Sequence, residues 1–140
     1  MKSPIPYRVP FTSLVTACLL LVGCGGGGRS TAPVPGIQPQ IVNVTDDFSY
    51  QVSSVANFSG AATYSWQNTG VSANINQATT VTSGAMTLII TDAVGTQVYS
   101  RSLADNGTFV TANGVAGTWS IRVQYAFGSG TVNFRAQKKT

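Results

Sequence analysis

Hydrophobic and polar residues alternate along much of the chain after residue 40, which is the period expected of β-strands with one buried face. The alternation is clearest in residues 118–127 and resumes in residues 131–136. Residues 128–130 (Gly-Ser-Gly) interrupt it, so we predict a C-terminal hairpin with a glycine-containing loop. Trp119 lies on the apolar side of the first of these strands and is predicted to be buried.

A second antiparallel pair is predicted from residues 85–91 and 96–103, joined by a type I turn that begins at Asp92 and ends at Gly95. Shorter upstream segments alternate in the same way. They are residues 48–52, 62–66 and 71–75, with turn-forming residues between them at 57–60 and 67–70. About seven to nine short strands without a helical pattern predict an all-β fold, a jelly-roll-like antiparallel β-sandwich.

The N-terminal residues have a different pattern. Two cations, Lys2 and Arg8, precede a mainly apolar stretch, residues 11–22. This stretch is shorter than the ~20 residues of a membrane-spanning helix. The following Leu21-Val22-Gly23-Cys24 resembles the lipobox of bacterial lipoproteins, in which the cysteine receives diacylglycerol before the preceding residues are removed. The alternative is an ordinary secreted protein with a cysteine at this position by chance.

The lipobox resemblance implies that residues 1–23 are a signal peptide and that Cys24 is the lipidation site, attached to the membrane of the cell envelope. Because Gly25 and not aspartate follows the cysteine, it implies the outer membrane. Residues 24–40 are rich in glycine and proline, which predicts a flexible tether, and residues 41–140 are a suitable size for one β-sandwich domain.

Three segments of the domain carry a second resemblance. They are residues 88–96, which end in Gly-Thr, residues 117–123 (Gly-Thr-Trp-Ser-Ile-Arg-Val) and residues 128–134, which contain a Gly-Thr-aliphatic return strand. In this order they resemble the jelly-roll sandwiches of proprotein-convertase P-domains and bacterial pre-peptidase C-terminal domains. Those families often place an aspartate before the first segment, where this chain has Gly84 and Ala85, so calcium binding is not carried over.

The composition excludes several functions. All four acidic residues are aspartates and the chain has no histidine, so Ser-His-Asp and Cys-His arrangements cannot form, and we expect no catalytic residues and no cofactor. Beyond residue 23, six cationic residues are scattered apart from the Lys138-Lys139 pair, which disfavours nucleic-acid binding.

Calcium is the one metal that the composition favours, because no histidine is present and no cysteine follows Cys24. Asp46 and Asp47 are weak candidate ligands, and a solvated turn is the favoured interpretation of this pair. Asp92 and Asp105 are interpreted first as turn formers. We therefore expect the domain to keep its fold without calcium.

The favoured function is that of a non-catalytic envelope lipoprotein, a structural or accessory module that contacts protein partners. The alternative is a cell-surface carbohydrate-binding module, because Tyr64 and Trp66 lie on one strand face beside amide side chains, as a sugar-stacking platform would need. The same spacing suits a protein core, and we expect Trp66 to point inward. An enzymatic role is expected only through association with a catalytic partner.

Overall fold

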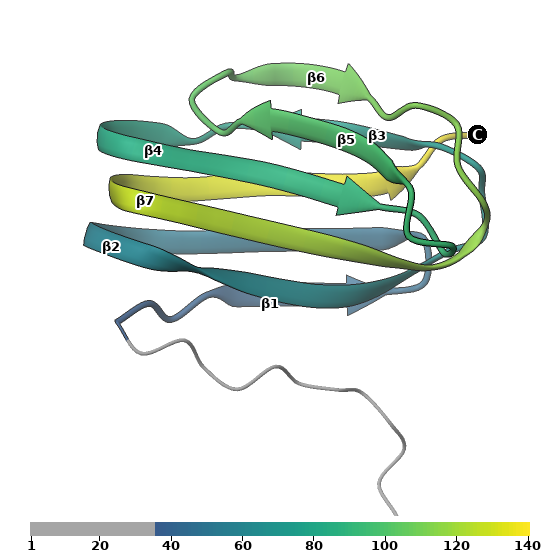
Figure 1. Ribbon diagram of the computed structural model, residues 1–140, viewed down its shortest axis with the longest axis horizontal. Coiled ribbons are helices and arrows are strands. Elements are labelled where there is room, and N and C mark those ends of the chain that lie inside the picture. Colours follow the sequence, from purple (N-terminus) through teal and green to yellow (C-terminus); the bar gives the residue numbers. More distant parts are fainter. Residues whose placement is uncertain (1–35) are drawn as a thin grey trace, which may run out of the picture.

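A computed structural model describes residues 36–140, which form an all-β domain (Figure 1). Every pair of neighbouring strands is antiparallel. The strands are β1 (Gln40–Val44), β2 (Asp47–Asn68), β3 (Ala73–Gln77), β4 (Thr80–Thr91), β5 (Gln97–Ser102), β6 (Gly107–Val110) and β7 (Gly117–Lys138). Among residues 36–140 there is no helix of the length and apolarity needed to span a membrane.

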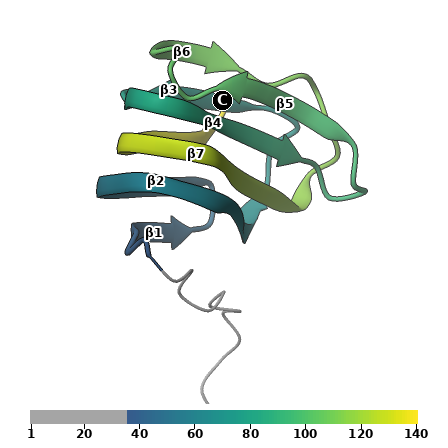
Figure 2. The ribbon, with the colours of Figure 1, turned by 60° about the vertical axis from the view of Figure 1, so that its left-hand side comes forward.

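Two long strands build both layers of the β-sandwich. β2 and β7 each contain 22 residues, pair with each other along most of their length and bend near the middle (Figures 1 and 2). One layer contains β1, the first half of β2, the second half of β7, β3 and β6. The other layer contains the second half of β2, the first half of β7, β4 and β5. The domain is therefore a single sheet folded over on itself.

The predicted C-terminal hairpin is wrong, because its two segments belong to one bent strand. β7 runs without interruption from Gly117 to Lys138, and its two halves pair with β2 instead of with each other. Residues 128–130 break the alternation because they form an irregularity within the strand, where Gly130 has φ 137°. Such a bulge shifts the buried positions by one residue and turns the strand into the second layer.

The predicted turn at residues 57–60 is wrong for the same reason. These residues lie inside β2, where the register against β7 shifts three times between Val52 and Gly60. The segments 48–52 and 62–66 are thus two halves of one strand. We call residues 53–60, 82–85 and 126–130, where β2, β4 and β7 turn from one layer to the other, the bend.

The predicted pairing of residues 85–91 with 96–103 is confirmed. β4 and β5 pair from Thr87 with Ser102 to Thr91 with Gln97. The Gly95 N–H donates to the Asp92 carbonyl oxygen at 3.1 Å, as the predicted type I turn requires.

Aromatic side chains from both halves of the long strands fill the core. Trp66 and Trp119 are 1% and 0% exposed and pack edge to face, with ring centroids 5.9 Å apart. The predicted burial of Trp119 and the inward orientation of Trp66 are confirmed. Tyr50 stacks on Phe134, with ring centroids 5.3 Å apart. Ile37, in the segment predicted as a tether, is also buried in this core, so packing begins upstream of β1.

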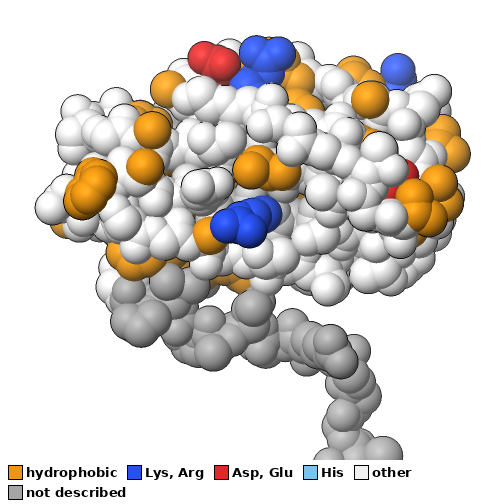
Figure 3. All heavy atoms as spheres, in the orientation of Figure 1, with side chains coloured by type: hydrophobic (Ala, Val, Ile, Leu, Met, Phe, Trp, Pro, Cys, Tyr) orange, Lys and Arg blue, Asp and Glu red, His pale blue; other side chains and the backbone are white. Residues whose placement is uncertain are grey.

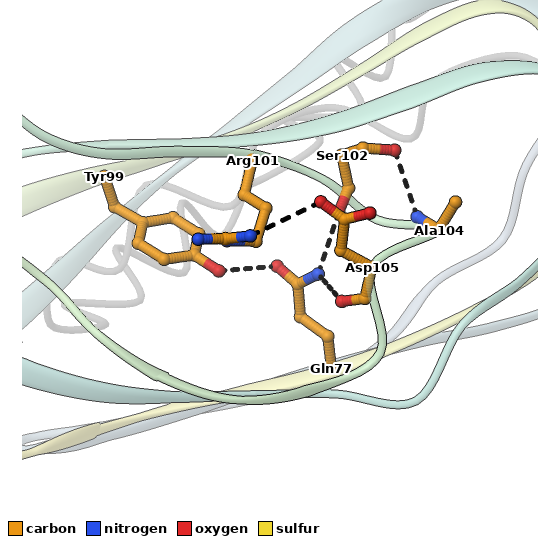
Figure 4. Close-up of polar contacts among 6 residues, drawn as sticks. All are labelled: Gln77, Tyr99, Arg101, Ser102, Ala104 and Asp105. Carbon is orange, nitrogen blue, oxygen red and sulfur yellow. Dashed lines mark hydrogen bonds and ion pairs between the residues drawn. The ribbon is translucent and has the colours of Figure 1, made fainter.

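A buried amide joins the two layers beside β5 (Figure 4). The Tyr99 hydroxyl donates to Gln77 Oε1 at 2.8 Å. Gln77 Nε2 donates to the carbonyl oxygens of Ser102 at 3.0 Å and Asp105 at 2.7 Å. Gln77 thereby ties β3 in one layer to β5 in the other and to the turn that follows β5.

The opposite side of the sandwich is closed by side chains from β1 and β2. Trp66 Nε1 donates to the Val44 carbonyl oxygen at 3.2 Å. Asn43 Nδ2 donates to the Ser65 carbonyl oxygen at 2.8 Å. These bonds connect β1 to the second half of β2, which belongs to the other layer.

Candidate functional site

Cys24, the predicted lipidation site, lies outside the described residues, which begin at Gly36. The structure does show where the chain enters the domain. A Cβ atom on Gly36 would lie 3.6 Å from the Phe58 ring, and Phe58 pairs with Gly128 in the bend. The chain therefore enters at the end of the sandwich that carries the bend.

Tyr64 and Trp66, the candidate sugar-binding pair, are placed in and against the core. Trp66 is 1% exposed. Tyr64 is half-buried, with its ring centroid 5.8 Å from that of Phe48 and 5.7 Å from that of Tyr50. Burial raises the pKa of the Tyr64 hydroxyl above its ordinary value. The two side chains do not form a shared exposed platform.

Asp46 and Asp47, the weak calcium candidates, are each paired with a different cation. Asp46 Oδ2 lies 2.8 Å from Lys138 Nζ, and the Asp46 carboxylate also accepts from the Thr69 N–H and hydroxyl. The Lys138 contact, together with the Thr69 bonds, holds the pKa of Asp46 at about 2. Asp47 accepts two hydrogen bonds from the Arg135 guanidinium, which lowers its pKa. Within residues 36–140, no three potential metal ligands of the His, Cys, Asp or Glu type gather in one place.

Three loops meet at the end of the sandwich opposite the bend (Figure 1). They are residues 69–72, 92–96 and 111–116, which we call the loop end. Main-chain hydrogen bonds join them. Gly114 N–H donates to the Val71 carbonyl oxygen at 2.7 Å, and Ala93 N–H donates to the Val115 carbonyl oxygen at 3.4 Å.

A buried carboxylate organises the loop end. Asp92 Oδ1 accepts from the N–H groups of Val94 at 3.1 Å and Thr96 at 2.8 Å, and Oδ2 accepts from the Val115 N–H at 2.9 Å. Desolvation raises the pKa of Asp92, but these N–H groups favour the charged form, and the net shift is downward. Asp92 is therefore a turn former, as predicted, and it also holds a second loop.

Gly114 packs directly over this carboxylate. A Cβ atom at position 114 would lie 2.7 Å from Asp92 Cβ and 2.9 Å from Val98 Cγ1. Any larger side chain would push the loops apart. The sequence carries no local sign of this contact, because Gly114 and Asp92 are far apart along the chain.

The loops present three exposed valines. Val71, Val94 and Val115 are 53%, 69% and 49% exposed, and hydrophobic side chains are visible at this end in Figure 3. Their backbones are fixed by the bonds to Asp92 and between the loops, so an approaching partner meets an apolar surface that is already ordered. The sequence prediction did not single out these valines, because only the fold brings them to one end.

The loop end offers a partner exposed valine side chains and loop main-chain groups. Its buried carboxylate is already bonded to three N–H groups. This chemistry suits the recognition of a surface more than proton transfer. Comparison with protein-family models found no match for this chain, and comparison with curated proteins found no similar sequence.

Proposed function

We propose that the protein is a non-catalytic lipoprotein of the cell envelope, whose β-sandwich domain is a structural or accessory module that contacts protein partners. The observation that supports this proposal is that the chain entry and the exposed valines lie at opposite ends of the domain. The chain that follows the lipobox enters at the bend, and the ordered valine loops lie at the other end. A lipid on Cys24 would thus anchor one end, at the outer membrane, and leave the loop end free for contact.

Partner contact is supported by the loop end, where exposed side chains are carried on an ordered backbone. Val94 is 69% exposed although its loop is held by a buried carboxylate, so its side chain is positioned without being covered. Binding through ordered loops avoids part of the entropy cost of fixing them during association. Exposed loops on a rigid scaffold are a common location for binding surfaces.

The lipid anchor is tested by flotation of membranes from cells that express the wild type or Cys24→Ser. We expect the wild type to float with outer-membrane fractions and Cys24→Ser to be lost from them, because only the thiol can accept the lipid. The urea unfolding midpoint of the purified Cys24→Ser protein serves as a folding control. Equal flotation of the two proteins would contradict the proposal.

Partner contact is tested by placing a photocrosslinking amino acid at Val94, with Gln124 on the exposed face of β7 as the control position. We expect a discrete protein adduct from position 94 in intact cells and none from position 124. The adduct should be lost when Val115, which lies on the adjoining loop, is replaced by Asp. Equal adducts from both positions, or an adduct at position 94 that survives Val115→Asp, would contradict a contact through the loop end.

A further inference from the structure

The bend carries no charge, and one of its aromatic side chains is largely exposed. Residues 53–60, 82–85 and 126–130 contain no Asp, Glu, Lys or Arg. The Phe127 side chain in the bend is 68% exposed. On the face seen in Figure 3, charged side chains are absent from the left-hand end, where Figure 1 places the bend. This end of the molecule differs from the rest of the domain, where aspartates and cations form ion pairs.

The exposed ring of Phe127 is held by a fixed backbone. Its N–H donates to Ser59 Oγ at 2.9 Å, and a Cβ atom on Gly84 would lie 2.1 Å from its carbonyl oxygen. The residue has φ 50°, which is uncommon for a non-glycine residue and would suit Asn or Gly better. β2 and β4 thus constrain Phe127 from both sides while its ring stays in solvent.

The N-terminal chain enters beside this ring. Gly36 lies against Phe58, and Phe58 pairs with Gly128, the residue after Phe127. Gly36 is twelve residues after Cys24, and a flexible chain of that length has a root-mean-square reach of about 20 Å. The second half of β2 extends away from the bend for about 30 Å, as estimated from the rise per residue of a strand. Because the average reach of such a chain is shorter than this length, a lipid on Cys24 would favour orientations in which the bend lies nearer to the bilayer than the loop end.

We propose that the bend rests on the lipid surface to which Cys24 is anchored, and that Phe127 inserts its ring among the lipid headgroups. The proposal depends on the lipid anchor proposed above. Protein segments that lie in the membrane interface place Trp, Phe and Leu side chains at the boundary between headgroups and acyl chains. An uncharged surface can approach lipid without the cost of desolvating ionised side chains. Since the bend also lacks cations, this contact requires no anionic lipid.

The test uses the mature lipidated protein, purified in detergent and reconstituted on phosphatidylcholine vesicles. In Phe127→Cys the introduced thiol is the only free one, because the sulfur of Cys24 is bound to lipid, and it is labelled with the fluorophore NBD. Val94→Cys at the loop end is the matched control, since Val94 is 69% exposed and Phe127 is 68% exposed. We expect the label at position 127 to shift its emission to the blue and to be quenched by nitroxide lipids. The label at position 94 should keep the spectrum of a water-exposed probe.

Flotation of the same vesicles separates the two proposals. A protein that does not float with vesicles lacks the anchor, and both proposals are then overturned. A protein that floats while the label at position 127 behaves like the label at position 94 retains the anchor and overturns only the contact between bend and lipid.

An unlabelled comparison excludes insertion caused by the apolar fluorophore. Hydrogen exchange of residues 53–60 and 126–130 is measured for the vesicle-bound wild type and for Phe127→Asn, a variant that tolerates the positive φ. We expect vesicles to slow exchange in the wild type and to slow it less in the variant. Equal exchange in the two proteins would contradict insertion of Phe127.

Discussion

Replacement of Trp66 by Ala tests whether this residue belongs to the core or to a sugar-binding surface. The Trp66 side chain is 1% exposed, contacts Trp119 edge to face and donates from Nε1 to the Val44 carbonyl oxygen at 3.2 Å. Removal of a buried tryptophan side chain costs about 3 to 5 kcal/mol, and loss of the donor to Val44 adds about 1 kcal/mol. Since small domains have free energies of unfolding of about 5 to 15 kcal/mol, Trp66→Ala should leave the domain barely stable or unfolded.

The control is Trp66→Phe, which keeps an aromatic ring against Trp119 and removes the indole N–H. We expect it to cost roughly 1 to 2 kcal/mol, well below the cost of the alanine variant. Urea unfolding followed by far-ultraviolet circular dichroism measures both values. A free energy of unfolding for Trp66→Ala within about 0.5 kcal/mol of the wild type would refute the core assignment. If that folded variant had also lost binding on a glycan array, carbohydrate recognition would replace the proposed function.

Three further predictions concern buried or paired polar groups. The pKa of Asp46 is lowered to about 2 and that of Asp47 is also lowered, so the free energy of unfolding should fall as the pH decreases from about 4 to 2. In Asp46→Asn, the urea unfolding midpoint should depend less on pH between these values. Burial raises the pKa of Tyr99 and of Tyr125 to about 12, so the free energy of unfolding should decrease between about pH 10 and 12. Phenolate absorbance should rise together with unfolding. Titration of these tyrosines in a domain that stays folded would contradict the prediction. Gln77→Glu would turn a carboxylate toward the carbonyl oxygens of Ser102 and Asp105, so we expect the free energy of unfolding to fall by about 2 to 4 kcal/mol at neutral pH. Urea unfolding should show a smaller difference from the wild type at acidic pH, where the carboxyl group is protonated. An unchanged midpoint would refute the assigned amide orientation.

Local patterns in the sequence were enough to predict segments of β2, β3, β4, β5 and β7 and one hairpin, but not β1 or β6. The alternation around Trp119 placed that residue in the core, because a period of two assigns one face of a strand. The turn between β4 and β5 was predictable because Asp92 and Gly95 are only three residues apart and bond to each other. The lipobox prediction for Cys24 is equally local and stays a prediction.

The path of the long strands was not predictable from such patterns. A glycine-containing break at residues 128–130 is compatible with a hairpin loop or with a bulge inside a strand. The choice depends on β2, whose own irregularity between Val52 and Gly60 bends together with β7. These partners are far apart in sequence, so the break alone did not reveal which structure forms.

The loop end required the same long-range information. Asp92 was predicted as a turn residue from its neighbours, but its bond to Val115 spans 23 positions of the chain. The exposure of Val71 and Val94 at one end follows from the order of the strands. Asp46 and Asp47 were considered as a calcium pair because nothing local indicated that Lys138 and Arg135 would lie beside them.

Cys24 is proposed to carry a lipid that anchors the domain to the membrane. Metabolic labelling with radioactive palmitate tests this anchor, with wild type and Cys24→Ser expressed to equal levels and isolated under denaturing conditions. We predict that label enters the wild-type protein and is absent from Cys24→Ser, because the modification needs the cysteine thiol. Equal incorporation into both proteins, or none into either, would contradict the claim.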